Sequence, residues 1–264
     1  MHLWDSISAK LIWIAAKFYL IEMENSLNED KFIKTLDNIT IVGTLHISES
    51  SRNMVEKIID EWHPDAIMLE LDDLRMQAFE HPFSYPIGIT VEKMDEQDDE
   101  SDELDGFGLL KEMEHLQFEI SKTMSESLGE EMKIAIRKGK EKGLPVIPID
   151  KSIEELAAEL QSKLTPKKKR ELKKRIQEEV SSGVTKEQYQ ELMEKIQSPE
   201  GLMEIINDLK SEFPEIVDSL LSDRNQFMVN QILSYRKDHP KEKLLIVVGL
   251  GHLHEIFELL KQKL

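Results

Sequence analysis

From residue 39 onward, apolar residues form short runs that alternate with helical repeats. The runs at 39–44 and 65–72 predict two buried strands, and apolar residues three and four positions apart between them predict a helix. His63-Pro64 ends this helix, because the residue before a proline avoids the α-helical conformation. A strand, a helix and a second strand of these lengths favour a right-handed parallel crossover.

The pattern changes after a third strand, which is predicted at 144–150. A fourth strand is predicted at 244–250, and the residues between the two show only helical spacing. Cap residues and first-turn prolines predict helices that begin near residues 152, 165, 185, 198 and 214. We therefore expect an α/β fold with a central, largely parallel sheet and a large helical insertion at about 151–240, between the third and last core strands.

The first 30 residues predict an amphipathic helix that precedes an α/β domain at 31–264. Its apolar face can pack on the same chain, on a second subunit or on a membrane surface. The apolar stretch at 11–21 is shorter than the roughly 20 residues of a membrane-spanning helix. We predict a homodimer through this helix in a cytoplasmic protein, with membrane association as an alternative. The apolar face recurs at spacings of three and four, at Leu3, Ile7, Leu11, Ile14, Phe18 and Ile21.

The composition narrows the partners and the metal chemistry. The chain has 34 basic and 52 acidic residues and a net charge of −18. This balance argues against a nucleic-acid partner, because nucleic-acid binding needs a basic footprint. The chain has no cysteine, so any metal ion would need histidine, aspartate or glutamate ligands.

Two histidines follow glycines at the ends of predicted strands. Gly43 precedes His46 at the first strand, and Gly249 precedes His252 at the fourth, both with the spacing Gly-x-x-His. Glycine at such a position permits a positive φ or a close approach of another part of the chain. Ligand sites of parallel sheets form at the carboxyl ends of the strands. His46 and His252 therefore face each other if the two strands are neighbours.

Two glutamates are candidates for the same site. Glu70 ends the second strand, where a buried carboxylate is costly unless it is paired or bound to a metal ion. Glu131 begins a predicted helix at 130–142, where the helix dipole alone would explain a carboxylate. Together with His46 and His252 they make a nitrogen and oxygen ligand set for zinc, manganese, iron or cobalt. The alternative is a set of polar residues that satisfy one another at strand ends.

Two arginines and an aspartate are further candidates. Arg75 is five residues past Glu70 and can return to the same edge of the sheet, although a helix-surface arginine would have the same spacing. Arg224 is ambiguous in the same way, because it is predicted in the middle of a helix beside Asp223. Asp150 ends the third strand, where it can cap the next helix.

Several segments resemble the TraB/PrgY family. They are "VGTLHISESS", "HPDAIMLELDDLR", "LGEEMKIAIRKGKEKGLPVIPID", "LLSDRNQFMVNQIL" and "IVVGLGHLHEI", in order between residues 39 and about 258. That family in turn resembles the Tiki proteases, the erythromycin esterases and the ChaN haem-binding proteins. The chain departs from the family at Lys151, where members often have arginine. The resemblance implies a sheet-based α/β core with two Gly-x-x-His histidines, paired glutamates and arginines, at His46, His252, Glu70, Glu131, Arg75 and Arg224.

The resemblance to the Tiki proteases implies a metal-dependent hydrolase, with a peptidase as the first expectation and a peptide or protein as substrate. The cofactor would be a divalent ion, manganese, zinc or cobalt, held by the two histidines and one or both glutamates. A glutamate that does not bind the metal, such as Glu70, would act as general base, and Arg75 or Arg224 would stabilise developing negative charge. The alternative is a non-catalytic peptide-binding or signal-sequestering regulator, and haem binding is a third expectation.

Overall fold

The computed structural model describes residues 31–44, 49–80, 105–113, 129–182, 195 and 198–264. Its strands are β1 (Ile33–Leu36), β2 (Ile39–Thr44), β3 (Ala66–Leu69), β4 (Val146–Pro148) and β5 (Leu244–Gly249). Its helices are α2 (Glu49–Trp62), α3 (Asp73–Glu80), α5 (Glu130–Lys142), α6 (Ile153–Lys163), α7 (Pro166–Ser182), α9 (Pro199–Glu212), α10 (Pro214–Val217), α11 (Asp223–Asp238) and α12 (Leu250–Lys263), with a π-helical turn η4 (Asp218–Ser222).

The strands form one sheet in the order β1-β2-β5-β3-β4. The pairs β2–β5, β5–β3 and β3–β4 are parallel, and β1 pairs antiparallel with β2. The predicted α/β fold with a largely parallel sheet is therefore confirmed. The two strands that carry the Gly-x-x-His motifs are neighbours, with Thr44 opposite Gly249.

The edge strand β1 differs from the sequence-based expectation, which begins the sheet at Ile39. Leu36 pairs with Ile39 across a tight connection through Asp37, whose φ of 53° lies in the left-handed region. Aspartate enters that region more readily than most residues, which suits it to a hairpin turn. Residues of β1 are mostly half-buried, so their hydrophobic pattern is too weak to distinguish a strand from a polar linker.

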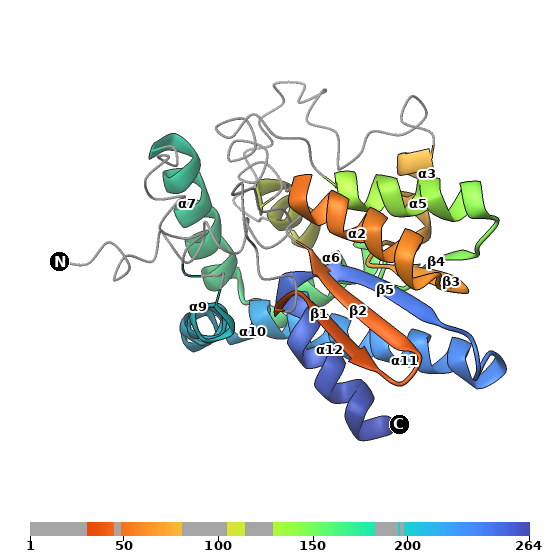
Figure 1. Ribbon diagram of the computed structural model, residues 1–264. Helices are drawn as coiled ribbons and strands as arrows, with labels where there is room; N and C mark the ends of the chain where they lie inside the picture. Colours follow the sequence, from red (N-terminus) through yellow and green to blue (C-terminus); the bar gives the residue numbers. More distant parts are fainter. Residues whose placement is uncertain (1–30, 45–48, 81–104, 114–128, 183–194, 196–197) are drawn as a thin grey trace.

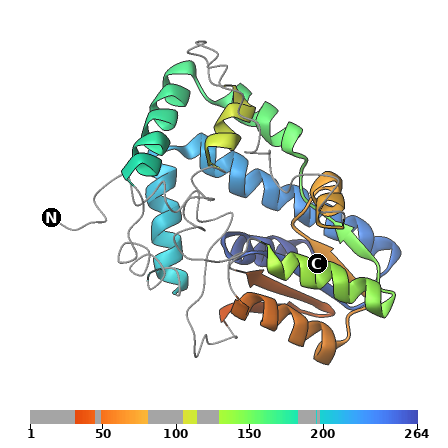
Figure 2. The same ribbon diagram turned by 90° about the horizontal axis from the view of Figure 1, so that it is seen from above.

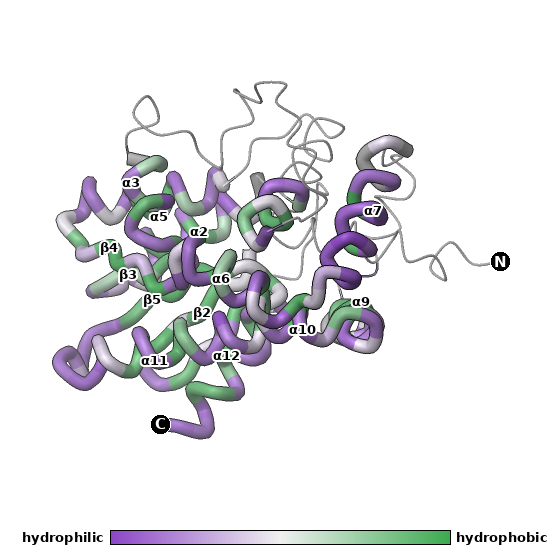
Figure 3. Tube along the Cα trace, turned by 180° about the vertical axis from the view of Figure 1, so that it is seen from behind, coloured by the Kyte–Doolittle hydropathy of each residue, from purple (hydrophilic) through white to green (hydrophobic). Residues whose placement is uncertain are grey.

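Helices cover both faces of the sheet (Figures 1 and 2). Alternate side chains of each strand point to opposite faces, so strands buried on both faces read as continuous apolar runs. Figure 3 shows these apolar strands enclosed by helices. On the α2 and α5 side the buried core includes Val42, Ile67, Val247, Val55, Ile59 and Ala135. On the α11 and α12 side it includes Ile41, Met68, Ile246, Met228, Ile232 and Ile256.

The described elements between β4 and β5 are helical, and α7 and α9 lie beyond one end of the sheet in Figure 1. Ser152 caps α6 in a reciprocal capping box with Glu155, and Ser198 caps α9 ahead of a first-turn proline. No helix in the described ranges has both the length and the apolar character of a membrane span. The amphipathic helix predicted at 1–30 and the helix predicted near 185 lie outside the described residues. The homodimer and the domain boundaries therefore stay predictions.

Gly43 explains why helix α12 lies close to strand β2. A Cβ atom on Gly43 would lie 2.9 Å from Cδ2 and 3.0 Å from Cβ of Leu253, the residue that follows His252. Gly43 is not among the described glycines with a positive φ, which are Gly129 and Gly143. The first Gly-x-x-His motif therefore needs its glycine for close packing and not for an unusual backbone conformation. The motif thereby sets the position of the first turn of α12.

We expect Gly43→Ala to lower the free energy of unfolding by about 1–3 kcal/mol, because the added methyl group must displace Leu253 or shift α12. Urea denaturation measures this loss. The matched experiment repeats the change in a Leu253→Ala background, where the 2.9 Å contact with Cδ2 is removed and the added cost should be smaller. An equal cost in both backgrounds would contradict the packing role of Gly43.

Candidate functional site

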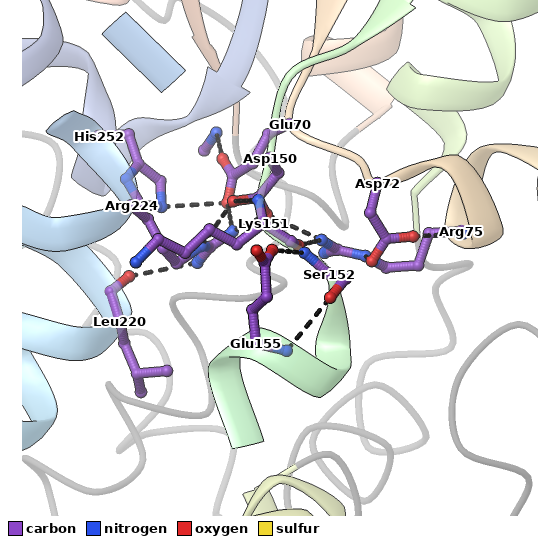
Figure 4. Close-up of polar contacts among 11 residues, drawn as sticks. Glu70, Asp72, Arg75, Asp150, Lys151, Ser152, Glu155, Leu220, Arg224 and His252 are labelled. Carbon is purple, nitrogen blue, oxygen red and sulfur yellow. Dashed lines mark hydrogen bonds and ion pairs between the residues drawn. The ribbon is translucent and has the colours of Figure 1, made fainter. Parts of the chain in front are cut away.

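Side chains from four separate segments meet at the carboxyl edge of the sheet. Glu70 directly follows β3, Asp150 follows β4, His252 lies in the first turn of α12 after β5, and Arg224 lies at the start of α11. All four are at least nine-tenths buried. Figure 4 shows them converging from these elements. The edge is the place where an open parallel sheet forms its ligand sites.

Arg224 is the centre of this cluster. Its Nε and Nη2 atoms donate to Oδ1 and Oδ2 of Asp150 at 3.0 and 2.5 Å, in a two-pronged pair. Nη2 also donates to Oε1 of Glu70 at 2.5 Å, and Nη1 donates to the carbonyl oxygen of Leu220 at 3.2 Å. A planar guanidinium suits such a site because its donors are held in a fixed fork. Arg224 therefore ties the ends of β3 and β4 to α11.

The π-helical turn η4 determines which way Arg224 faces. The N–H of Asp223 bonds to the carbonyl of Asp218, five residues back, where an α-helix would bond four residues back. One extra residue in a turn rotates everything that follows by about 100° around the helix axis. This rotation directs Arg224 to the sheet edge, and π-turns of this kind recur at functional sites.

Glu70 links the two central strands. Its backbone N–H donates to the carbonyl of Val247 at 3.1 Å, which continues the pairing of β3 with β5. Its Oε2 atom accepts from the N–H of Gly249 at 2.6 Å, and its Oε1 atom lies 3.0 Å from Nε2 of His252. The second Gly-x-x-His motif thus places a backbone donor and an imidazole against the same carboxylate.

Arg75 extends the cluster from α3. Asp72 caps that helix, because its Oδ1 accepts from the N–H of Arg75 at 2.7 Å, while its Oδ2 accepts from Arg75 Nε at 2.9 Å. Arg75 Nη2 then donates to Asp150 Oδ2 at 2.8 Å and to the carbonyl of Lys151 at 3.0 Å. Arg75 is about a quarter exposed, so it forms the solvent-facing end of the cluster.

The charges of the cluster stabilise one another's ionised forms. Burial alone would raise the pKa of Asp150, but the charges of Arg224 and Arg75 outweigh burial and hold that pKa below its ordinary value. Burial alone would lower the pKa of Arg224, but the negative charges of Asp150 and Glu70 outweigh burial and raise that pKa. When all are ionised, three carboxylates, those of Glu70, Asp72 and Asp150, face two guanidinium groups. The cluster then carries one excess negative charge, which favours a proton or a cation beside it.

The structure describes some of the predicted metal ligands but not all of them. His252 and Glu70 are together at the sheet edge, as expected, whereas His46 lies outside the described residues. Glu131 is fully buried in the first turn of α5, which begins after Gly129 in the left-handed conformation. Within the described ranges, no group of three or more His, Asp or Glu side chains is placed to hold a metal ion. The ligand roles of His46 and Glu131 stay predictions.

The sequence patterns did not identify two residues of the site, Asp72 and Asn225, and gave a third, Asp150, too small a role. Asp150 was expected only to cap the next helix, yet it binds both arginines. Its place at a strand end, like that of Glu70, was the signal that could have found it. Asp72 and Asn225 carried no comparable signal. Asn225 is fully buried, and its Oδ1 atom lies 2.5 Å from Nδ1 of His252.

The fold and this cluster define an α/β protein with a buried ionic network at the carboxyl edge of a largely parallel sheet. The chain belongs to the TraB/PrgY/gumN family, which matches residues 32–263. It is also similar to an uncharacterized protein of Methanocaldococcus jannaschii, with 29% identity over 238 residues. That match covers 85% of this chain and 54% of the relative, so the chain spans about half the length of the curated relative that it matches.

Proposed function

We propose that this protein is a metal-dependent hydrolase that acts on a peptide or protein substrate. The observation that carries the proposal is the pairing of His252 with Glu70, whose Nε2 and Oε1 atoms lie 3.0 Å apart at the carboxyl edge of the sheet. An imidazole nitrogen and a carboxylate oxygen are ligands that zinc, manganese and cobalt share. The excess negative charge of the surrounding cluster supports the same assignment, because it favours a cation.

The remaining ligands of the proposed ion follow from chain position. His46 comes two residues after β2, which is the direct neighbour of β5, and would supply the second imidazole. Glu131 is the candidate for a further carboxylate ligand. A bound divalent ion would supply an activated water and would polarise the carbonyl group that is to be cleaved.

The side chains of the cluster divide the remaining tasks. Glu70, where it is not a ligand, would accept a proton from the attacking water. Arg224 is held by Glu70 and Asp150 and would keep both carboxylates oriented. Arg75 is the more accessible arginine and would stabilise negative charge on the substrate. These roles require the two arginines to stay paired with Asp150, as their raised pKa values favour.

We expect His46→Ala and His252→Ala to lose bound metal while they stay folded. Elemental analysis after loading with manganese, zinc or cobalt measures the metal, and circular dichroism checks the fold. His254→Ala is the matched control, because His254 is exposed on the same helix and should leave metal binding unchanged. Full metal retention in both His46→Ala and His252→Ala would rule out the proposed site.

A non-catalytic peptide-binding or signal-sequestering regulator is the second candidate function. The mutual pairing of Glu70, Asp150 and Arg224 favours it, because a buried network whose charges pair with one another can keep the edge of the sheet rigid without any catalytic role. A peptide-library digest with each metal, with and without a chelator, separates the two functions. Chelator-sensitive cleavage that is absent from His252→Ala supports the hydrolase, and retention of peptides without cleavage supports the regulator.

A further inference from the structure

His252 is held from behind by two side chains that the proposed reaction does not use. Nδ1 of His252 lies 2.5 Å from Oδ1 of Asn225 on α11. The other end of the same amide, Nδ2 of Asn225, donates to Oε2 of Glu255 at 2.7 Å. His252 and Glu255 are three residues apart on α12, so they share one face of the helix and both reach Asn225. The three side chains form a continuous relay between the two helices.

The donor and acceptor roles in this relay follow in order from Glu255. An ionised carboxylate only accepts hydrogen bonds, so the amide nitrogen of Asn225 must face Glu255. The carbonyl oxygen of Asn225 must then face His252, and because that oxygen also only accepts, Nδ1 of His252 must carry a proton. The assignment needs both contacts of Asn225, since an asparagine without Glu255 could turn its amide around.

We propose that Asn225, oriented by Glu255, is a positioning residue that keeps a proton on Nδ1 of His252 and thereby presents Nε2 to a cation shared with Glu70. The neutral imidazole has a single lone pair on the nitrogen that carries no proton, and only that nitrogen can bind a metal ion. With Nδ1 protonated, this nitrogen is Nε2, which lies 3.0 Å from Oε1 of Glu70. The carboxylate oxygen also only accepts, so without an ion this contact needs a proton on Nε2, and a bound cation would replace that proton while Nδ1 keeps its own. The inference rests on the proposed role of His252 as a ligand.

The packing of α11 supports a positioning role beyond simple burial. Arg224 and Asn225 are adjacent on α11, and they reach the two halves of the pair, Glu70 and His252 respectively. One helix therefore holds both groups that face each other at the sheet edge. A partner on the second nitrogen of a metal-binding histidine is typically worth 10–100-fold in metal affinity.

The test combines nitrogen NMR of the imidazole with zinc titration of the full chain. The signals of His252 are identified as those that vanish in His252→Ala. In the zinc-free wild type we expect both ring nitrogens of His252 to carry a proton, and in the zinc-loaded protein we expect Nδ1 alone to keep its proton. In Asn225→Leu the acceptor at Nδ1 is gone, so the proton on Nδ1 should be lost, while Nε2 keeps its proton against Glu70 and that proton competes with zinc. We expect zinc affinity to fall by about 10–100-fold.

A swap of the two partners provides the matched control. Asn225→Asp alone sets two carboxylates against each other and should weaken zinc binding. In the double variant Asn225→Asp with Glu255→Gln, the glutamine amide donates to the aspartate, which again offers an oriented acceptor to His252. We expect the zinc affinity and the proton on Nδ1 to return close to those of the wild type. Glu255→Ala gives a second readout if Asn225→Leu does not fold. Without Glu255 the side-chain amide of Asn225 can turn its nitrogen toward His252, and the proton on Nδ1 should then be lost.

The outcomes separate this inference from the proposed function. A wild-type imidazole that carries no proton on Nδ1 would overturn the positioning role of Asn225. So would an unchanged zinc affinity in folded Asn225→Leu and Glu255→Ala. A wild-type protein that carries the Nδ1 proton but binds no metal would support the hold of Asn225 on that proton and would contradict both the cation site and the metal-dependent hydrolase.

Discussion

Arg224→Met is expected to lower the free energy of unfolding by about 3–5 kcal/mol, the usual cost of removing one partner from a buried ion pair. Arg224 is 1% exposed, and it donates to both Asp150 and Glu70. Methionine fills a similar volume but leaves two buried carboxylates without their shared donor. Urea denaturation at neutral pH measures the loss.

The matched control is Arg236→Met, which makes the same substitution on the same helix. Arg236 contacts the exposed Asp37 at 3.5 Å, and an exposed ion pair of this kind is worth about 1 kcal/mol or less. We therefore expect a clear difference between the two variants. Similar losses in both would show that the buried network does not hold the edge of the sheet together.

The second large effect is expected for Asp150→Asn, with a loss of about 3–5 kcal/mol at neutral pH that disappears in acid. The pKa of Asp150 is lowered in the folded protein from its ordinary value of 3.8, because Arg224 and Arg75 outweigh the effect of burial. A lowered folded pKa stabilises the protein fully above the unfolded pKa, and the contribution is lost as the pH falls through the folded value. The difference between wild type and Asp150→Asn should therefore shrink below about pH 4.

Asp60→Asn distinguishes this buried effect from a surface effect. Hydrogen bonds from Lys138 and Lys142 lower the pKa of Asp60 to about 2, but these groups lie on the surface of α2 and α5. Salt screens exposed charges and affects buried pairs much less. High salt should therefore reduce the loss of unfolding free energy caused by Asp60→Asn and leave the loss caused by Asp150→Asn unchanged. An Asp150→Asn effect that does not change with pH would contradict the ion-pair explanation.

Local patterns predicted the strands and most of the described helices because each depends on residues close in sequence. The runs at 39–44, 65–72 and 244–250 contain β2, β3 and β5, and Gly143 ends α5 with a φ of 67° as a helix-ending glycine does. The hairpin strand β1 was missed because its four residues, three of them half-buried and one exposed, give little periodic signal. The extra residue in η4 was equally hidden, because its neighbours retain a helical pattern.

The sequence alone determined the α/β class and placed Glu70 and His252 at the ends of strands, because burial and strand polarity are encoded locally. The tertiary structure decided which side chains meet there. Arg224 reaches Glu70 across 154 residues of chain, and the π-turn and the order of the strands bring them together. Contacts at such separations depend on how whole elements pack, so Asp150 and Asn225 became part of the site only when the helices were docked on the sheet.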